Sequence, residues 1–171
     1  MESKQEQIQY LLDLLKTNHI SFQSKEHKEV TSMDEYEEIE KDLHCEMVKN
    51  LFLCNRQQTS FYLLLMPKDK KFKTKELSAQ IQSARLSFAS EEALSSLLRC
   101  RMGSTSILGL LFDQENKVKL LIDKDLFSFP LCGIHPCDNH MTLSLNLKEL
   151  LSFMEKEAHH TYQEVTLFGL D

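Results

Sequence analysis

The chain has 171 residues, of which 42% are hydrophobic and 27% are charged, and its formal net charge is −6. This length predicts a single domain over residues 1–171, and the composition excludes extensive disorder. The acidic balance argues against a general nucleic-acid coat, because phosphate binding draws on clustered Lys and Arg. The first residues lack the apolar core of a signal peptide, no apolar run reaches membrane-spanning length, and the five cysteines follow no framework pattern. We therefore expect a cytoplasmic protein with free thiols and no membrane partner.

Helix-capping signals mark two predicted helices near the start of the chain. Ser3 with Glu6 is typical of a capping box, and apolar residues at helical spacing predict a helix that continues to about Lys16. Ser32 with Glu35 forms a second capping box before an acidic segment whose apolar side is thin. We expect this second helix to lie on the surface.

Apolar runs of strand length predict two hairpins. Residues 48–54 and 61–66 flank a polar turn and should pair antiparallel. Residues 107–112 and 118–122 flank a second polar turn and predict a second hairpin. The two hairpins supply the centre of the expected sheet.

Helices and strands alternate irregularly over the rest of the chain. Residues 74–82 predict a short helix, and Ser90 caps another. Residues 141–145 read as a strand, Asn146 caps a final amphipathic helix, and residues 162–167 predict a last strand. Strand runs separated by helices indicate an α+β domain around a mixed, largely antiparallel sheet.

The stretch from Gly133 to Thr142 is the densest set of candidate site residues. Pro136 biases His135 toward an extended conformation, which holds the histidine on a stiff loop. Asn139 adds an amide and Thr142 a hydroxyl, so the stretch can form the polar rim of a small pocket. An ordinary turn is the alternative interpretation.

The same loop contains sulfur and imidazole groups that suggest two other kinds of chemistry. Four potential metal ligands lie close together, namely Cys132, His135, Cys137 and His140. Structural zinc sites usually draw ligand pairs from separate segments, so we expect no metal here and no other cofactor. A thiol nucleophile at Cys137 is also disfavoured, because a proline separates it from His135.

Two further segments are candidates for ligand contact. Gly103 and Ser104 can bring backbone amides close to a ligand, although a simple turn also fits. A run of lysines after Pro67 is either a solvated loop or a contact for RNA phosphates; it contains Lys68, Lys70, Lys71, Lys73 and Lys75.

Several of these landmarks, in order, resemble the YbaK/ProX family of aminoacyl-tRNA deacylases, which is related to the editing insertion of bacterial prolyl-tRNA synthetase. The matching segments are 48–53, 85–90, Gly103-Ser104 with Gly109-Leu110, and Gly133-Ile134-His135-Pro136 with Asn139 and Thr142. The likeness covers nearly the whole chain. It is greatest to the free-standing branch that removes alanine from mischarged proline tRNA.

This resemblance implies a mixed sheet that is curled into a partial barrel with helices packed outside it. It implies that Lys49 and Asn50 are the catalytic pair, with the lysine most needed for hydrolysis. It implies that His135 recognises the aminoacyl group and that Gly103 and Ser104 line the same pocket. The remaining substrate-binding positions that we expect are Gly133, Ile134, Asn139 and Thr142.

The implied reaction suits these residue types. Ester hydrolysis requires a positioned water and stabilisation of the oxyanion that develops on the carbonyl. Lys49 can supply positive charge, and Asn50 with the Gly103-Ser104 amides can supply hydrogen-bond donors. The hypothesis is a trans-editing hydrolase that needs no covalent intermediate.

Two alternatives to the hydrolase hypothesis stay open, one for the substrate and one for the activity. The hydrolase hypothesis has the acceptor end of mischarged tRNA(Pro) as its substrate, with alanine as the expected amino acid. One alternative keeps the reaction but changes the amino acid to cysteine, serine or threonine. Another is a binding module that holds an aminoacyl end without turnover. Prolyl-tRNA synthetase is a second candidate partner, and Lys68, Lys70, Lys71 and Lys73 are the candidate RNA contacts.

Overall fold

In the part of the chain that our computed structural model describes, residues 3–169, eight strands form one mixed sheet. The strand order is β1-β7-β6-β2-β3-β5-β8, and β4 pairs with β2 outside this path. The strands are β1 (Phe22–Glu26), β2 (Glu46–Cys54), β3 (Phe61–Pro67), β4 (Ser87–Phe88), β5 (Val118–Asp123), β6 (Cys132–Ile134), β7 (Met141–Leu145) and β8 (Tyr162–Val165). Four strand pairs are antiparallel and three are parallel. The predicted α+β class and mixed sheet are confirmed; the sheet is open and does not close into a barrel.

Four of the five α-helices among the described residues begin where the capping signals predicted, and the short third one begins without a side-chain cap. They are α1 (Lys4–Thr17), α2 (Met33–Leu43), α3 (Thr74–Gln80), α4 (Glu91–Leu98) and α5 (Leu147–Ala158), with the 3-10 helices η1 (Ile107–Phe112) and η2 (Lys124–Ser128). Ser3 and Glu6 form the reciprocal capping box, and the side chains of Ser32, Ser90 and Asn146 each accept a hydrogen bond from the first helical turn. These contacts satisfy backbone donors that a helix leaves unpaired at its start. No helix among the described residues is long and apolar enough to span a membrane.

The predicted second hairpin is wrong. Residues 107–112 form η1 and not a strand, and the Ser106 side chain accepts a hydrogen bond of 3.1 Å from the Leu108 amide at its start. A Cβ atom on Gly109 would lie 2.6 Å from the Leu98 carbonyl oxygen, so η1 packs directly against α4. β5 instead pairs in parallel with both β3 and β8. An apolar run of this length fits a buried helical turn as well as a strand, and packing against α4 decides between them.

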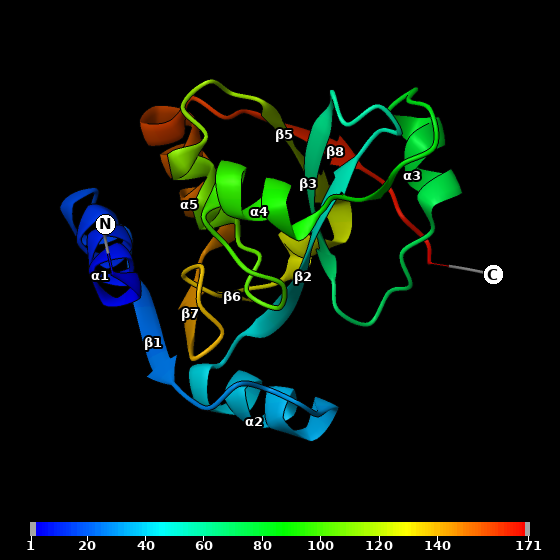
Figure 1. Cartoon of the computed structure of the whole chain (residues 1–171). Helices are drawn as coiled ribbons and strands as arrows, with labels where there is room; N and C mark the ends of the chain where they lie inside the picture. Colours follow the sequence, from blue (N-terminus) through cyan, green and yellow to red (C-terminus); the bar gives the residue numbers. More distant parts are fainter. Residues whose placement is uncertain (1–2, 170–171) are drawn as a thin grey trace.

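The two faces of β2 contact different helices. Val48 and Phe52 project into the largest apolar cluster, with residues of α1, α4 and α5. On the opposite face, Met47 packs with α2 and Leu53 packs with α3. Figure 1 shows α2 and α3 well apart, near opposite ends of β2. Lys49 lies between Met47 and Leu53 on that second face, in the interval that the two helices leave.

Candidate functional site

The parallel pairing of β2 with β6 places Lys49 near His135. Met47 pairs with Gly133, so Lys49 and His135 follow two positions further along the two neighbouring segments. On the other side of β6, Ile134 pairs with Leu143 of β7, which brings Thr142 next to the position after Ile134. Lys49, His135 and Thr142 thus come from three adjacent segments of the sheet, although they are far apart in the sequence.

Lys49 is a half-buried cation whose hydrogen-bond partner is a carbonyl group. Its Nζ donates to the Lys70 carbonyl oxygen at 2.5 Å, so the segment that follows β3 lies over it. Burial lowers the pKa of Lys49, and the negative charge of Asp69 opposes this effect. Among the described residues no carboxylate forms an ion pair with Lys49. Its charge therefore remains available to an anionic group of a ligand.

His135 is a buried imidazole with one ring nitrogen committed. Its Nδ1 lies 2.9 Å from the Met141 carbonyl oxygen, which can only accept, so Nδ1 carries the hydrogen. In the neutral ring Nε2 then holds a lone pair. Burial is the main reason that the pKa of His135 lies below its ordinary value, although the bond to Met141 acts in the other direction. His135 is thus suited to accept a hydrogen bond at Nε2, for example from an ammonium group.

His27 belongs to this site and was missed in the sequence. Its Nδ1 donates to the Lys28 carbonyl at 2.8 Å, and its Nε2 lies 2.8 Å from Thr142 Oγ1, which therefore donates to it. The His27 and His135 ring centroids are 6.2 Å apart. His27 and Thr142 are 115 positions apart, so no local pattern joins them. The available signal was a histidine at the end of an extended segment just before a capped helix.

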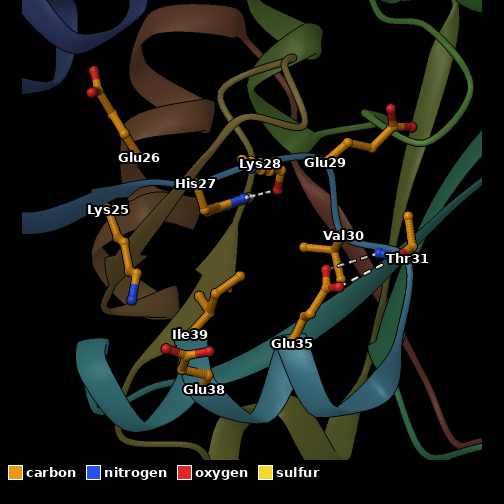
Figure 2. A pocket seen from close by; sticks show the side chains of 10 residues that line it. All are labelled: Lys25, Glu26, His27, Lys28, Glu29, Val30, Thr31, Glu35, Glu38 and Ile39. Carbon is orange, nitrogen blue, oxygen red and sulfur yellow. Dashed lines mark hydrogen bonds between the residues drawn. The ribbon is translucent and has the colours of Figure 1, made fainter.

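A cavity of about 490 Å³ opens beside His27, between residues 25–31 and α2 (Figure 2). Figure 2 shows the bonds from the Glu35 carboxylate to Thr31, which fix the far end of this segment against the helix. Ile39 supplies an apolar part of the wall. The residues that we predicted from the sequence do not line this cavity, and His27 connects it to Thr142.

Gly103 and Asn139 bring two of the predicted loops together. Gly103 has a φ of +87°, and a Cβ atom there would lie 3.7 Å from Asn139 Nδ2. The Ser104 hydroxyl accepts from the Arg101 amide and donates to the Arg101 carbonyl, both at 3.0 Å. The Ser104 side chain therefore closes its own turn. The Ser104 amide also donates to the Arg101 carbonyl, at 2.9 Å, so this one of the two expected backbone donors is engaged within the turn.

Asn50 faces the side of β2 opposite to Lys49. Its Nδ2 donates to the Val48 carbonyl at 3.2 Å, while its Oδ1 is buried and has no hydrogen-bond partner among the described residues. We had expected Asn50 to supply a donor. In this geometry the amide nitrogen donates within β2, and the side chain does not reach the face of Lys49.

Gly133 and Ile134 support the site from within the fold. A Cβ atom on Gly133 would lie 2.5 Å from Met47 Sδ, so glycine leaves room for the Met47 side chain against β6. Ile134 is 1% exposed and packs in the largest apolar cluster. The structure thus places Ile134 behind the sheet and does not bring it to the face of Lys49.

The predicted lysine cluster is largely engaged within the chain. Ion pairs join Lys68 to Glu40, and Lys70 to Asp123 and Asp125 at 2.7 Å each. Lys71 and Lys73 also interact with other groups of the chain. An RNA-binding role for these four lysines stays a prediction.

The cysteine of the histidine loop is a core residue. Cys137 is fully buried, and its contact with Cys100, followed by burial, raises the pKa of its thiol well above the ordinary value. A thiol in this state is a poor nucleophile. Within residues 3–169 no group of three or more His, Cys, Asp or Glu side chains is placed to hold a metal ion.

Comparison with known proteins gives a consistent result. Residues 27–153 match the model of the aminoacyl-tRNA editing domain family. The chain is 34% identical over 167 residues to the prolyl-tRNA editing protein ProX of Acetoanaerobium sticklandii, covering 98% of this chain and 99% of that protein. It is 30% identical to the prolyl-tRNA synthetase associated domain-containing protein 1 of Danio rerio, covering 87% and 82%. A crystal structure proposed to be a trans-editing enzyme for prolyl tRNA synthetase shares the fold, with a TM-score of 0.71, 16% identity and 98% coverage of both chains.

Proposed function

This chain belongs to the aminoacyl-tRNA editing domain family, and we propose that it hydrolyses the ester of mischarged proline tRNA in trans. It is an aminoacyl-tRNA deacylase, and the names of its relatives support proline tRNA as the tRNA concerned. The observation that carries the proposal is the register of β2 and β6, which puts Lys49 and His135 on neighbouring segments, with the Lys49 ammonium bonded to a carbonyl group and the His135 Nδ1 bonded to Met141. Because charged tRNA is the substrate, the proposal places the protein in the cytoplasm.

The proposed reaction uses water as the nucleophile. The water oxygen bonds to the ester carbonyl carbon, the bond from that carbon to the ribose oxygen breaks, and a proton passes to the ribose oxygen. Lys49 stabilises the negative charge that develops on the carbonyl oxygen, or holds a phosphate next to it. His135 Nε2 accepts a hydrogen bond from the α-ammonium group of the amino acid. Burial of Cys137 supports a path without a covalent enzyme intermediate.

Alanine is the amino acid that we propose for this substrate. It is smaller than proline, and a synthetase pocket discriminates against the loss of a methylene by only about 1–3 kcal/mol. A second site that admits only the smaller residue corrects that error. Cysteine, serine and threonine are the alternative amino acids, and a binding module without turnover is the alternative activity.

Deacylation of proline tRNA charged separately with alanine, cysteine, serine, threonine and proline tests the proposal. We expect rapid loss of the alanyl ester alone, and loss of that activity in Lys49→Ala. Lys148→Ala is the matched control, because Lys148 is an exposed lysine of α5. Turnover of a different ester would replace alanine but keep the reaction, and no turnover of any ester would refute the hydrolase. Addition of prolyl-tRNA synthetase to the same assay tests whether the synthetase is a partner.

A further inference from the structure

We propose that the surface formed by α3, the turn after it and β4 binds the unpaired 3′ end of the tRNA substrate. This inference rests on the proposed function, because it assigns a docking surface for the same substrate. We call it the α3–β4 surface and define it by Lys75, Ser78, Gln82, Arg85 and Phe88. Figure 1 shows α3 at the end of the sheet away from α2 and the cavity of Figure 2.

A cationic cavity of about 600 Å³ lies on this surface. Lys75 and Arg85 are both exposed, and within residues 3–169 neither forms an ion pair. The wall contains no carboxylate; its other members are Thr74, Ser78, Ala79, Gln82 and Ser83. Each of four other surface cavities has at least one carboxylate in its wall. An anion therefore meets less repulsion here than at those sites.

A buried hydroxyl in the same wall lacks a partner. Ser78 Oγ is buried and forms no hydrogen bond with any described residue. An unsatisfied buried polar group is unfavourable, so such groups usually have an explanation in a missing partner. This hydroxyl is an unsatisfied donor in the cavity wall, for which a phosphate or ribose oxygen can supply the acceptor.

An exposed aromatic ring continues the surface toward Lys49. Phe88 is 63% exposed and contacts Phe72 edge to face, with ring centroids 6.0 Å apart. It pairs with Leu53 of β2, whose side chain projects to the same face as Lys49. Four residues of strand separate Leu53 from Lys49, which is about 13 Å at 3.3 Å per residue. Phe72 lies two residues after Lys70, whose carbonyl holds Lys49.

Positive charge beside an exposed aromatic ring is the usual surface for an unpaired nucleic-acid strand. Cations contact the phosphates, and bases stack on the ring regardless of their identity. Lys68 and Lys70, by contrast, are already neutralised by carboxylates of the chain. The α3–β4 surface thus explains how a chain of net charge −6 can hold an RNA end.

Fluorescence anisotropy of a labelled acceptor-stem hairpin of proline tRNA tests this surface. Two RNAs that carry no amino acid are compared, one with the unpaired 3′ end and one with a blunt end. We expect Phe88→Ala to weaken binding of the first RNA about tenfold, and Phe88→Tyr, which keeps the ring, to bind like the natural protein. Lys75→Ala with Arg85→Ala should lower the slope of log affinity against log salt by about 1.4, at about 0.7 per phosphate of single-stranded RNA.

The controls are an exposed lysine and an exposed aromatic residue elsewhere, Lys148→Ala and Tyr10→Ala, which should leave binding unchanged. Equal binding by the natural protein, Phe88→Ala and the double variant would overturn the inference, as would equal affinity for the blunt RNA. This binding measurement is independent of the hydrolase test, because an RNA without an attached amino acid has no ester to hydrolyse. Deacylation with an unchanged KM in these variants refutes the surface alone, whereas RNA binding without deacylation refutes the proposed function alone.

Discussion

Loss of His27 should destabilise the protein through Thr142. Thr142 is fully buried, and its hydroxyl has the His27 Nε2 atom as its partner at 2.8 Å. His27→Ala leaves that hydroxyl unsatisfied, which we expect to lower the free energy of unfolding by about 1–3 kcal/mol. Thr142→Val removes the hydroxyl itself, and the half-buried His27 can then bond to water, so this variant should lose less. Once the hydroxyl is absent, removal of His27 should lower the free energy of unfolding little further.

A double-mutant cycle with urea unfolding measures this coupling. We expect an interaction energy of about 1 kcal/mol between His27→Ala and Thr142→Val, and a melting temperature about 2–4 °C lower for each kcal/mol lost. Additive effects, within roughly 0.3–0.5 kcal/mol, would refute the bond as a source of stability.

Three further outcomes follow from single contacts. Burial lowers the pKa of His135, so as the pH falls from about 6.5 through the folded-state pKa the unfolded chain binds the proton first. Stability should fall over that window, and His135→Gln should remove that part of the pH dependence in urea titrations; an unchanged dependence would contradict it. Gly109→Ala should lower the free energy of unfolding by about 1–3 kcal/mol, because the added Cβ would lie 2.6 Å from the Leu98 carbonyl oxygen. An unaltered melting temperature would contradict this prediction. Lys70→Met should lower the free energy of unfolding by about 3 kcal/mol, because the fully buried Asp123 carboxylate then lacks its cation. The slope of log RNA affinity against log salt should stay unaltered in this variant. A lower slope would show that Lys70 does contact the RNA.

Local signals predicted most elements of the fold, and long-range packing decided the rest. Ser3, Ser90 and Asn146 bond within their own first helical turn, so the sequence alone locates those helix starts. Residues 107–112 depend on the approach of α4 to Gly109, which no local pattern contains. Because residues 107–112 are not a strand, β5 has other neighbours than predicted and pairs in parallel with strands distant in the sequence.

The candidate site was likewise predicted in part from local sequence, and the rest depends on long-range packing. Lys49 and His135 stand in recognisable local sequences, and the structure brings both to neighbouring segments of the sheet. His27 was missed because its role comes from Thr142, across the β1–β7 pair. The sequence also cannot show which way Ile134 faces without the register of β6, and that register places it in the core.

Lys49 differs from its neighbours in what neutralises its charge. Lys68 and Lys70 form ion pairs with carboxylates, whereas the ammonium of Lys49 has the Lys70 carbonyl as its partner. Burial of the Lys49 ammonium carries a cost in desolvation that the negative charge of Asp69 offsets only in part, and the lowered pKa of Lys49 reflects that cost. A negative charge that appears next to it recovers this free energy. In ester hydrolysis such a charge develops as the water attacks, so the lysine interacts more strongly with the transition state than with the neutral ester. The ion pairs of Lys70 with Asp123 and Asp125 contribute to this difference, because they fix the segment whose carbonyl holds Lys49.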